Sequence, residues 1–494
     1  MTDKGYYDII IRGATVIDGS GAPGSLADVA VSDGRIADVG ELSGLSATRE
    51  IEAGGLVVAP GFIDSHTHDD RLLLSDPTMA PKASQGVTTV VAGNCGISLA
   101  PLRAKGTPPP PLNLLGGEDW YRFGSFADYL DHVDANPAAV NALFLVGHMT
   151  LRVGAMDTLD RGASDREIAA MRERLAEALD AGAAGLSTGL AYDPSRAAPT
   201  EEVIALAELL GPAGGIYATH MRNESDAVTE SVEETLKIGR CAGARVVISH
   251  HKVMGRRNWG MTRQTLARIE EARAGQPVAL DVYPYVASST VLNPRTAASA
   301  TRTVVLSSGA RPDLAGLDLD ECAHRLGCTE AKAIERLQPA VGLYFSMDED
   351  DVKRVLAYPG TMIGSDGLPH TDMPHPRLWG TFPRVLGHYC RELGLITLED
   401  AVHRMTGLAA REYGLSKRGL VRPGYHADLV IFDPKTVADR ATFEDPIQPA
   451  AGIETVLVAG IPVWEGGQPT GERPGRALRR GELRPCGAAA PGRD

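Results

Sequence analysis

The chain has 494 residues, of which 43% are hydrophobic and 23% are charged, and its formal net charge is −14 at pH 7. This composition is typical of a folded globular protein, and the acidic balance excludes a general affinity for nucleic acid or anionic membranes. No apolar run is long enough to cross a bilayer, the first residues are polar, and six cysteines in so long a chain do not indicate a disulfide framework. We therefore expect a cytoplasmic protein without nucleic-acid or membrane partners.

Both ends of the chain contain short β-branched runs separated by glycines. Asp8–Ile11 and Asp28–Val31 are such runs near the N-terminus, and Asp428–Phe432 and Glu454–Val458 are their counterparts near the C-terminus. Runs of this kind, bounded by turn residues, favour β-strands. We expect residues 1–59 and 415–494 to form one small β-sandwich domain together.

Residues 60–414 have a different pattern, in which short apolar runs alternate with helical periodicity. This alternation predicts an α/β fold with a parallel sheet. One helix should begin after Ser164, which has Glu167 at capping-box spacing, and end at Gly182. Eight strands are predicted, the number that a (β/α)8 barrel needs: Phe62–Asp64, Thr88–Val91, Leu143–Val146, Ala183–Leu186, Gly215–Ala218, Val246–Ile248, Val278–Val282 and Thr361–Ile363. Residues 289–347 should form an insertion over the barrel mouth.

Two histidines follow the first predicted strand, in the motif Gly61-Phe-Ile-Asp-Ser-His-Thr-His68. Side chains at positions i and i+2 of a strand share one face, and imidazole nitrogens are suitable zinc ligands. On its own, the pair His66 and His68 could equally be two hydrogen-bonded histidines at a strand end.

Further candidate ligands follow other predicted strands: Cys95 the second, His220 the fifth, His250 the sixth and Asp366 the eighth. A parallel barrel gathers its active site at the C-terminal ends of its strands. Each residue alone could be an ordinary buried polar group. Their repeated position after strands predicts that they meet in one site.

Several longer motifs accompany these residues. They are Gly93-Asn-Cys-Gly96, Ser187-Thr-Gly-Leu-Ala-Tyr-Asp-Pro194, Asp281-Val-Tyr-Pro-Tyr285 and Ser365-Asp-Gly-Leu-Pro-His370. With them, the chain resembles the amidohydrolase superfamily over nearly its whole length, and within it the N-acyl-D-amino acid deacylases, or D-aminoacylases. The resemblance implies zinc-dependent hydrolysis of a small N-acyl-D-amino acid to a carboxylate and a free D-amino acid. The preference for the D form rests on the resemblance alone.

The resemblance also implies a ligand set. One tight zinc would be held by Cys95, His220 and His250, and a second, weaker position would lie at His66 and His68. Cys95 would take the place of the bridging lysine of the wider superfamily. A thiolate and two imidazoles leave a fourth position for water, whose pKa the metal lowers. Asp366, beside the metal, would accept the proton of that water and pass it to the leaving amine.

Other residues would bind the substrate. By resemblance, Lys252, Tyr283 and Arg377 would hold the α-carboxylate, and Tyr192 would donate a hydrogen bond to the scissile carbonyl group. Each could also be an ordinary packed or surface side chain. Arg295, with Ser289 nearby, would suit an acidic side chain such as that of D-glutamate, whereas the alternative is a solvated loop arginine.

Two other functions stay open at this point. A cyclic amidase of the dihydroorotase or hydantoinase type would use a lysine bridge where this chain has Cys95. A non-catalytic amidohydrolase-like scaffold would be expected to have lost metal ligands, whereas this chain keeps all of them. No GxxxxGK[ST] phosphate loop is present.

Overall fold

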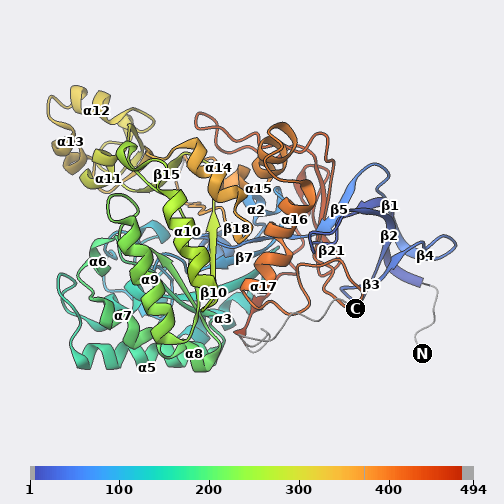
Figure 1. The fold of residues 1–494 in the computed structure, drawn as a ribbon, viewed down its shortest axis with the longest axis horizontal. Coiled ribbons are helices and arrows are strands. Elements are labelled where there is room, and N and C mark those ends of the chain that lie inside the picture. The colour runs from blue at the N-terminus through green and yellow to red at the C-terminus, as the bar shows by residue number, and fades with distance from the viewer. Residues whose placement is uncertain (1–5, 372, 481–494) are drawn as a thin grey trace.

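Eight parallel strands form the centre of the structure, a computed structural model that describes residues 6–371 and 373–480. All eight predicted strands are present, five of them with slightly different ends. They are β6 (Phe62–Asp64), β7 (Val87–Ala92), β10 (Asn141–Gly147), β11 (Gly185–Gly189), β12 (Ile216–His220), β13 (Arg245–Ile248), β14 (Val278–Val282) and β18 (Thr361–Ile363). They are hydrogen-bonded in this chain order, so the predicted (β/α)8 barrel is confirmed (Figure 1).

Helices between and after these strands cover the outside of the barrel, as Figure 1 shows for one side. The principal ones are α3 (Phe126–Ala135), α5 (Asp165–Ala181), α7 (Thr200–Ala207), α9 (Val228–Ala242), α10 (Thr262–Arg273), α14 (Glu349–Ala357) and α16 (Leu398–Met405). The prediction for α5 is confirmed at both ends. Ser164 and Glu167 form a reciprocal capping box, and Gly182 ends the helix in the left-handed region at φ 117°. None of the helices in the described part is long and apolar enough to cross a bilayer.

The barrel closes between β6 and β18 without a regular strand ladder. Backbone hydrogen bonds join the two segments just beyond the strand ends: Asp366 N donates to His66 O at 2.7 Å, and His68 N donates to Gly367 O at 3.1 Å. These bonds lie among the candidate metal ligands. The closure of the barrel therefore fixes the loop of Asp366 against the two histidines.

A buried lysine reinforces this closure. Lys82, in α2 (Ala80–Ala83), has its Nζ 2.7 Å from both Asp64 Oδ2 and Ser365 Oγ. All three side chains are fully buried. Because Asp64 ends β6 and Ser365 precedes Asp366, one charged network ties the first and last strands together below the candidate site.

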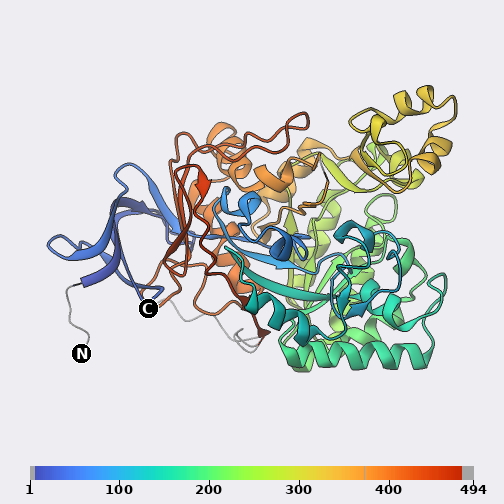
Figure 2. The same cartoon turned by 180° about the vertical axis from the view of Figure 1, so that it is seen from behind.

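Strands from both ends of the chain form a second sheet, beside the barrel (Figures 1 and 2). It contains β1 (Tyr6–Val16), β2 (Ser25–Ser32), β3 (Arg35–Gly40), β4 (Ser46–Glu52), β5 (Val57–Pro60), β19 (Leu429–Phe432), β20 (Ile453–Val458), β21 (Ile461–Glu465) and β22 (Gln468–Pro469). Most pairs are antiparallel, and apolar side chains pack on both faces of β1 and β2. The expected joint domain of the two chain ends is confirmed. Its predicted limits, 59 and 415, stay predictions, and residues 1–5 and 481–494 lie outside the described residues.

The expected insertion follows β14 and forms a small lobe with its own sheet. Antiparallel strands β15 (Ala287–Val291), β17 (Ala340–Phe345) and β16 (Arg302–Ser308) are accompanied by α11 (Pro294–Ser299), α12 (Leu319–Arg325) and α13 (Glu330–Leu337). A separate apolar core holds this lobe together. It projects from the barrel at the end away from the terminal sheet, and its first strand and helix contribute to the wall of the candidate site (Figure 1).

Candidate metal centre and active site

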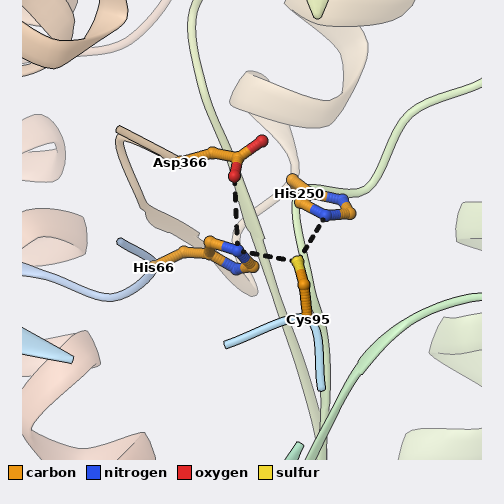
Figure 3. A group of neighbouring side chains, drawn as sticks. All are labelled: His66, Cys95, His250 and Asp366. Carbon is orange, nitrogen blue, oxygen red and sulfur yellow. Dashed lines mark hydrogen bonds and ion pairs between the residues drawn. The ribbon is translucent and has the colours of Figure 1, made fainter. Parts of the chain in front are cut away.

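Four buried side chains from different barrel strands meet at the C-terminal end of the barrel (Figure 3). They are His66, Cys95, His250 and Asp366, and their ligand atoms all lie within 4.8 Å of one another. Cys95 Sγ lies 3.3 Å from both His66 Nε2 and His250 Nε2. Asp366 Oδ1 lies 3.5 Å from His66 Nε2. Residues far apart in the sequence therefore form one compact set of donors.

The remaining two predicted ligands border this set. His68 Nε2 lies 3.2 Å from Asp366 Oδ1, and His220 Nδ1 lies 3.8 Å from Cys95 Sγ. The structure thus brings all six predicted ligand residues together. Cys95 lies between the His66 side of the site and the His220 and His250 side.

Three of these residues have an uncommon backbone conformation. The φ angles of Cys95, His250 and Asp366 are 53°, 37° and 50°. Side-chain-bearing residues rarely adopt this left-handed region, and such strain is concentrated at functional sites. Here it comes two or three residues after the end of a strand in each case and turns the side chain toward the centre of the barrel mouth.

The donor set fits zinc. Thiolate sulfur, imidazole nitrogen and carboxylate oxygen are the ligand types that zinc takes in proteins. Burial alone would raise the pKa of the Cys95 thiol, but the neighbouring His66 and His250 hold it well below its usual value. The sulfur is therefore available as a thiolate, the form that binds a metal.

A cavity of about 620 Å³ opens above these residues. Its wall includes His68, His220, His250 and Asp366, so the metal centre is accessible from it. Of the predicted substrate-binding residues, Tyr192, Lys252, Ser289 and Arg295 line the cavity, whereas Tyr283 and Arg377 do not.

Tyr192 is held at the edge of the metal centre. Its hydroxyl group lies 3.1 Å from Thr290 Oγ1, and its ring centroid lies 4.9 Å from that of His220. Burial raises the pKa of the Tyr192 phenol well above its usual value. The phenol therefore keeps its proton and can donate a hydrogen bond.

Lys252, Tyr283 and Arg377 form a stack beside the cavity. The guanidinium group of Arg377 lies 4.6 Å above the Tyr283 ring, and Lys252 Nζ lies 5.7 Å from the same ring. Arg377 is 1% exposed, and its Nη2 donates to the carbonyl oxygen of Ser289 at 3.2 Å. Of Lys252, Tyr283 and Arg377, only Lys252 lies on the cavity wall.

Arg295 lies at the start of α11, in the insertion. It is exposed, lines the cavity and makes no hydrogen bond or ion pair with any residue that the structure describes. Ser289 lines the same cavity from β15. An unpaired guanidinium group is therefore available to an anion that enters the cavity.

Two acidic residues at the site were missed by the sequence analysis. Asp281 Oδ1 accepts a hydrogen bond from His250 N at 2.8 Å and lies 3.6 Å from His66 Nδ1. Glu224 contacts His220, His250 and Lys252. Asp281 is the last residue but one of a predicted strand and Glu224 comes four residues after His220, so the rule that identified the ligands could have identified both.

Known proteins resemble this chain over nearly its whole length. The model of the amidohydrolase family matches residues 49–464. The D-aminoacylase of Alcaligenes xylosoxydans xylosoxydans is 55% identical over 480 residues, which are 97% of this chain and 99% of that protein. The N-acyl-D-aspartate deacylase of the same organism is 52% identical over 493 residues, 98% of this chain and 99% of that protein.

A solved structure shares the fold as well. It is the N-acyl-D-glutamate deacylase of Bordetella bronchiseptica, complexed with zinc and a phosphonate inhibitor that mimics the tetrahedral intermediate. It is 47% identical to this chain, covers 96% of this chain and 100% of its own, and gives a TM-score of 0.93.

Proposed function

Because the chain belongs to the amidohydrolase family, in the group of the D-aminoacylases, we propose that it hydrolyses N-acyl-D-amino acids to a carboxylate and a free D-amino acid. The observation that carries this proposal is the meeting of Cys95 with His66, His220 and His250 beside Asp366, at the base of a cavity. Three relatives with 47–55% identity are named for this class of substrate.

Zinc is the proposed cofactor. Cys95, His220 and His250 would hold the tight ion, and His66 and His68 would form a second, weaker position. When bound, zinc supplies a Lewis acid that polarises a carbonyl group and lowers the pKa of water. The thiolate character of Cys95 and the mixed sulfur and nitrogen donors support zinc over a hard cation such as magnesium.

Asp366 is the proposed proton carrier. Burial would raise the pKa of its carboxyl group, but Arg377 and His250 hold that pKa well below its usual value, so Asp366 starts as a carboxylate. In this form it can accept a proton from the attacking water and then protonate the leaving amine. The Tyr192 phenol would donate to the carbonyl oxygen as negative charge develops there.

The substrate's α-carboxylate needs a positive environment. Lys252 offers an ammonium group on the cavity wall, and Tyr283 and Arg377 complete the proposed carboxylate pocket behind it. Arg295 and Ser289 are the proposed readers of the side chain, with a preference for acidic side chains such as those of D-aspartate and D-glutamate. The unpaired state of Arg295 supports this preference, because an arginine beside a cavity gains a charge-assisted hydrogen bond when an anion enters.

A reducing compartment such as the cytoplasm is the proposed setting. Cys95 can bind a metal only as an unoxidised thiolate. The five cysteines among the described residues are all free thiols.

The alternatives fit the structure less well. A cyclic amidase would use a lysine of the fourth barrel strand as the bridging ligand, in the role that Cys95 has here. That strand, β11, contains no lysine. A non-catalytic scaffold would have no need to keep six ligand residues in contact around one point.

The proposed function is tested by incubating the zinc-loaded protein with N-acetyl-D- and N-acetyl-L-amino acids and with hydantoin and dihydroorotate, and by quantifying the free amine. We expect hydrolysis of the D series, fastest for acidic side chains, and none of the cyclic amides. Hydrolysis of the L series or of the cyclic amides alone would overturn the proposal.

A further inference from the structure

Glu224 contacts the outer nitrogens of two histidines at the same time. Its Oε1 lies 3.1 Å from His250 Nδ1, and its Oε2 lies 3.5 Å from His220 Nε2. The opposite nitrogens of the two rings face Cys95, with His250 Nε2 at 3.3 Å and His220 Nδ1 at 3.8 Å from Sγ. Glu224 is 2% exposed.

The two rings are therefore used in opposite senses. His250 directs Nε2 at the metal position and Nδ1 at Glu224. His220 is turned the other way, with Nδ1 directed at the metal position and Nε2 at Glu224. A carboxylate beside the outer nitrogen of a metal-binding imidazole orients the ring. A carboxylate has two acceptor oxygens and no donor, so one Glu224 can serve both rings.

We propose that Glu224 is the positioning residue of the metal centre, which holds His220 and His250 with their inner nitrogens directed at one ion. This inference rests on the proposed function only in so far as the ion is zinc. Glu224 also lines the cavity, but in this proposal it acts through the two histidines.

Lys252 compensates the buried charge of Glu224. Its Nζ lies 2.9 Å from the Glu224 carboxylate. It also lies 2.6 Å from His250 Nδ1, so Lys252 and Glu224 face the same nitrogen of that ring. A buried carboxylate is tolerated only when it is paired and hydrogen-bonded. Because Lys252 is also on the cavity wall, Glu224 links the metal ligands to the part of the cavity proposed for the substrate carboxylate.

Two substitutions separate the contact of Glu224 with the two histidines from its pairing with Lys252. Glu224→Gln keeps the shape but offers one acceptor oxygen, while its amide group donates and cannot accept from the second imidazole. Glu224→Asp keeps the negative charge for Lys252, but its shorter side chain cannot span both rings. Both variants should therefore lose part of the zinc site, and Glu224→Asp should do so without leaving Lys252 unpaired.

Glu202→Gln is the matched control. Glu202 is also buried, at 1% exposed, and its Oε1 lies 3.0 Å from Nε2 of a buried histidine, His148. It does not line the cavity, and neither it nor His148 is among the candidate ligands. This variant shows what the loss of a buried histidine–carboxylate contact does to the fold alone.

The experiment measures the zinc dissociation constant of each metal-free protein by competition with a chromophoric chelator, together with the Tm of the metal-free form. We expect both Glu224 variants to bind zinc about 10- to 100-fold more weakly than the parent protein, and Glu202→Gln to bind it unchanged. Excess zinc should restore part of the kcat of the Glu224 variants, whereas a merely structural defect would not respond to zinc.

Different results would contradict the role of Glu224 and the proposed function. If both Glu224 variants bind zinc as tightly as the parent, or if Glu202→Gln weakens zinc as much as they do, the positioning role is wrong. If the parent protein binds zinc but hydrolyses no N-acyl-D-amino acid, the proposed function fails, while the role of Glu224 is still decided by the dissociation constants.

Discussion

Arg377 Nη1 lies 2.8 Å from Asp366 Oδ2, and both side chains are buried. The other carboxylate oxygen of Asp366, Oδ1, lies 3.2 Å from His68 Nε2. One oxygen of the proposed proton carrier is thus fixed by a guanidinium group, while the other is directed at the metal centre. This arrangement orients Asp366 and keeps it ionised.

Asp366→Asn should abolish most of the turnover. The amide keeps the shape of the side chain but cannot take up the proton of the water. We expect kcat to fall by at least about 100-fold, the usual scale for the loss of a general base. Bound zinc, measured by atomic emission, should change little. A variant with near-normal kcat would exclude Asp366 as the proton carrier.

Arg377→Met should lower kcat/KM for all N-acyl-D-amino acids alike, because every substrate carries the α-carboxylate. It should also change the pH profile. Arg377 lowers the pKa of Asp366, so its removal raises that pKa, and a higher pH is then needed to ionise the base. The acidic limb of the plot of kcat against pH should therefore move to higher pH. An unchanged limb would show that Arg377 does not tune Asp366.

Cys95→Ala should remove the tight zinc and nearly all activity, because the sulfur lies between the two halves of the ligand set. His66→Ala should weaken the second position more than the first. The measurement is zinc stoichiometry after dialysis, with Cys322→Ala as the control, since Cys322 is a buried free thiol in the insertion. Full zinc content in purified Cys95→Ala would contradict the assignment.

Arg295→Ala should act on some substrates only. A charge-assisted hydrogen bond contributes about 1.5–3 kcal/mol, so kcat/KM for N-acetyl-D-glutamate should fall by roughly 10- to 150-fold. The value for N-acetyl-D-leucine should be largely spared. Arg302→Ala is the control, because Arg302 lies in the same insertion and pairs with Asp318. An equal effect on both substrates, or none, would rule out the acidic preference and leave the deacylase proposal intact.

Glu202→Gln should alter the dependence of stability on pH. Burial would raise the pKa of Glu202, but its hydrogen bonds with His148 and Arg152 outweigh this and lower it to about 2. Because the folded-state pKa is depressed, the stabilisation is present above the unfolded value near 4.5 and is lost as the pH falls toward 2. The Tm difference between parent and variant should therefore be largest near neutral pH and shrink in acid. A constant difference would show that Glu202 does not titrate in this way.

The sequence by itself determined the barrel, the terminal domain and the six candidate ligand residues. Apolar runs, caps and glycines are local signals, so α5 and all eight barrel strands could be predicted from them. The ligands could be predicted because parallel strands place whatever follows them at one end of the barrel. His66, Cys95, His250 and Asp366 each occupy that position in the chain.

Only the tertiary structure decided how these residues are held. The left-handed backbone of Cys95 and the double contact of Glu224 leave no local pattern in the sequence. Arg377 could be expected near a carboxylate, but not paired with Asp366 behind the cavity wall. Such contacts depend on how the loops after neighbouring strands pack against one another. Because an unpaired charge is costly when it is buried, the burial of a charged side chain selects an oppositely charged partner.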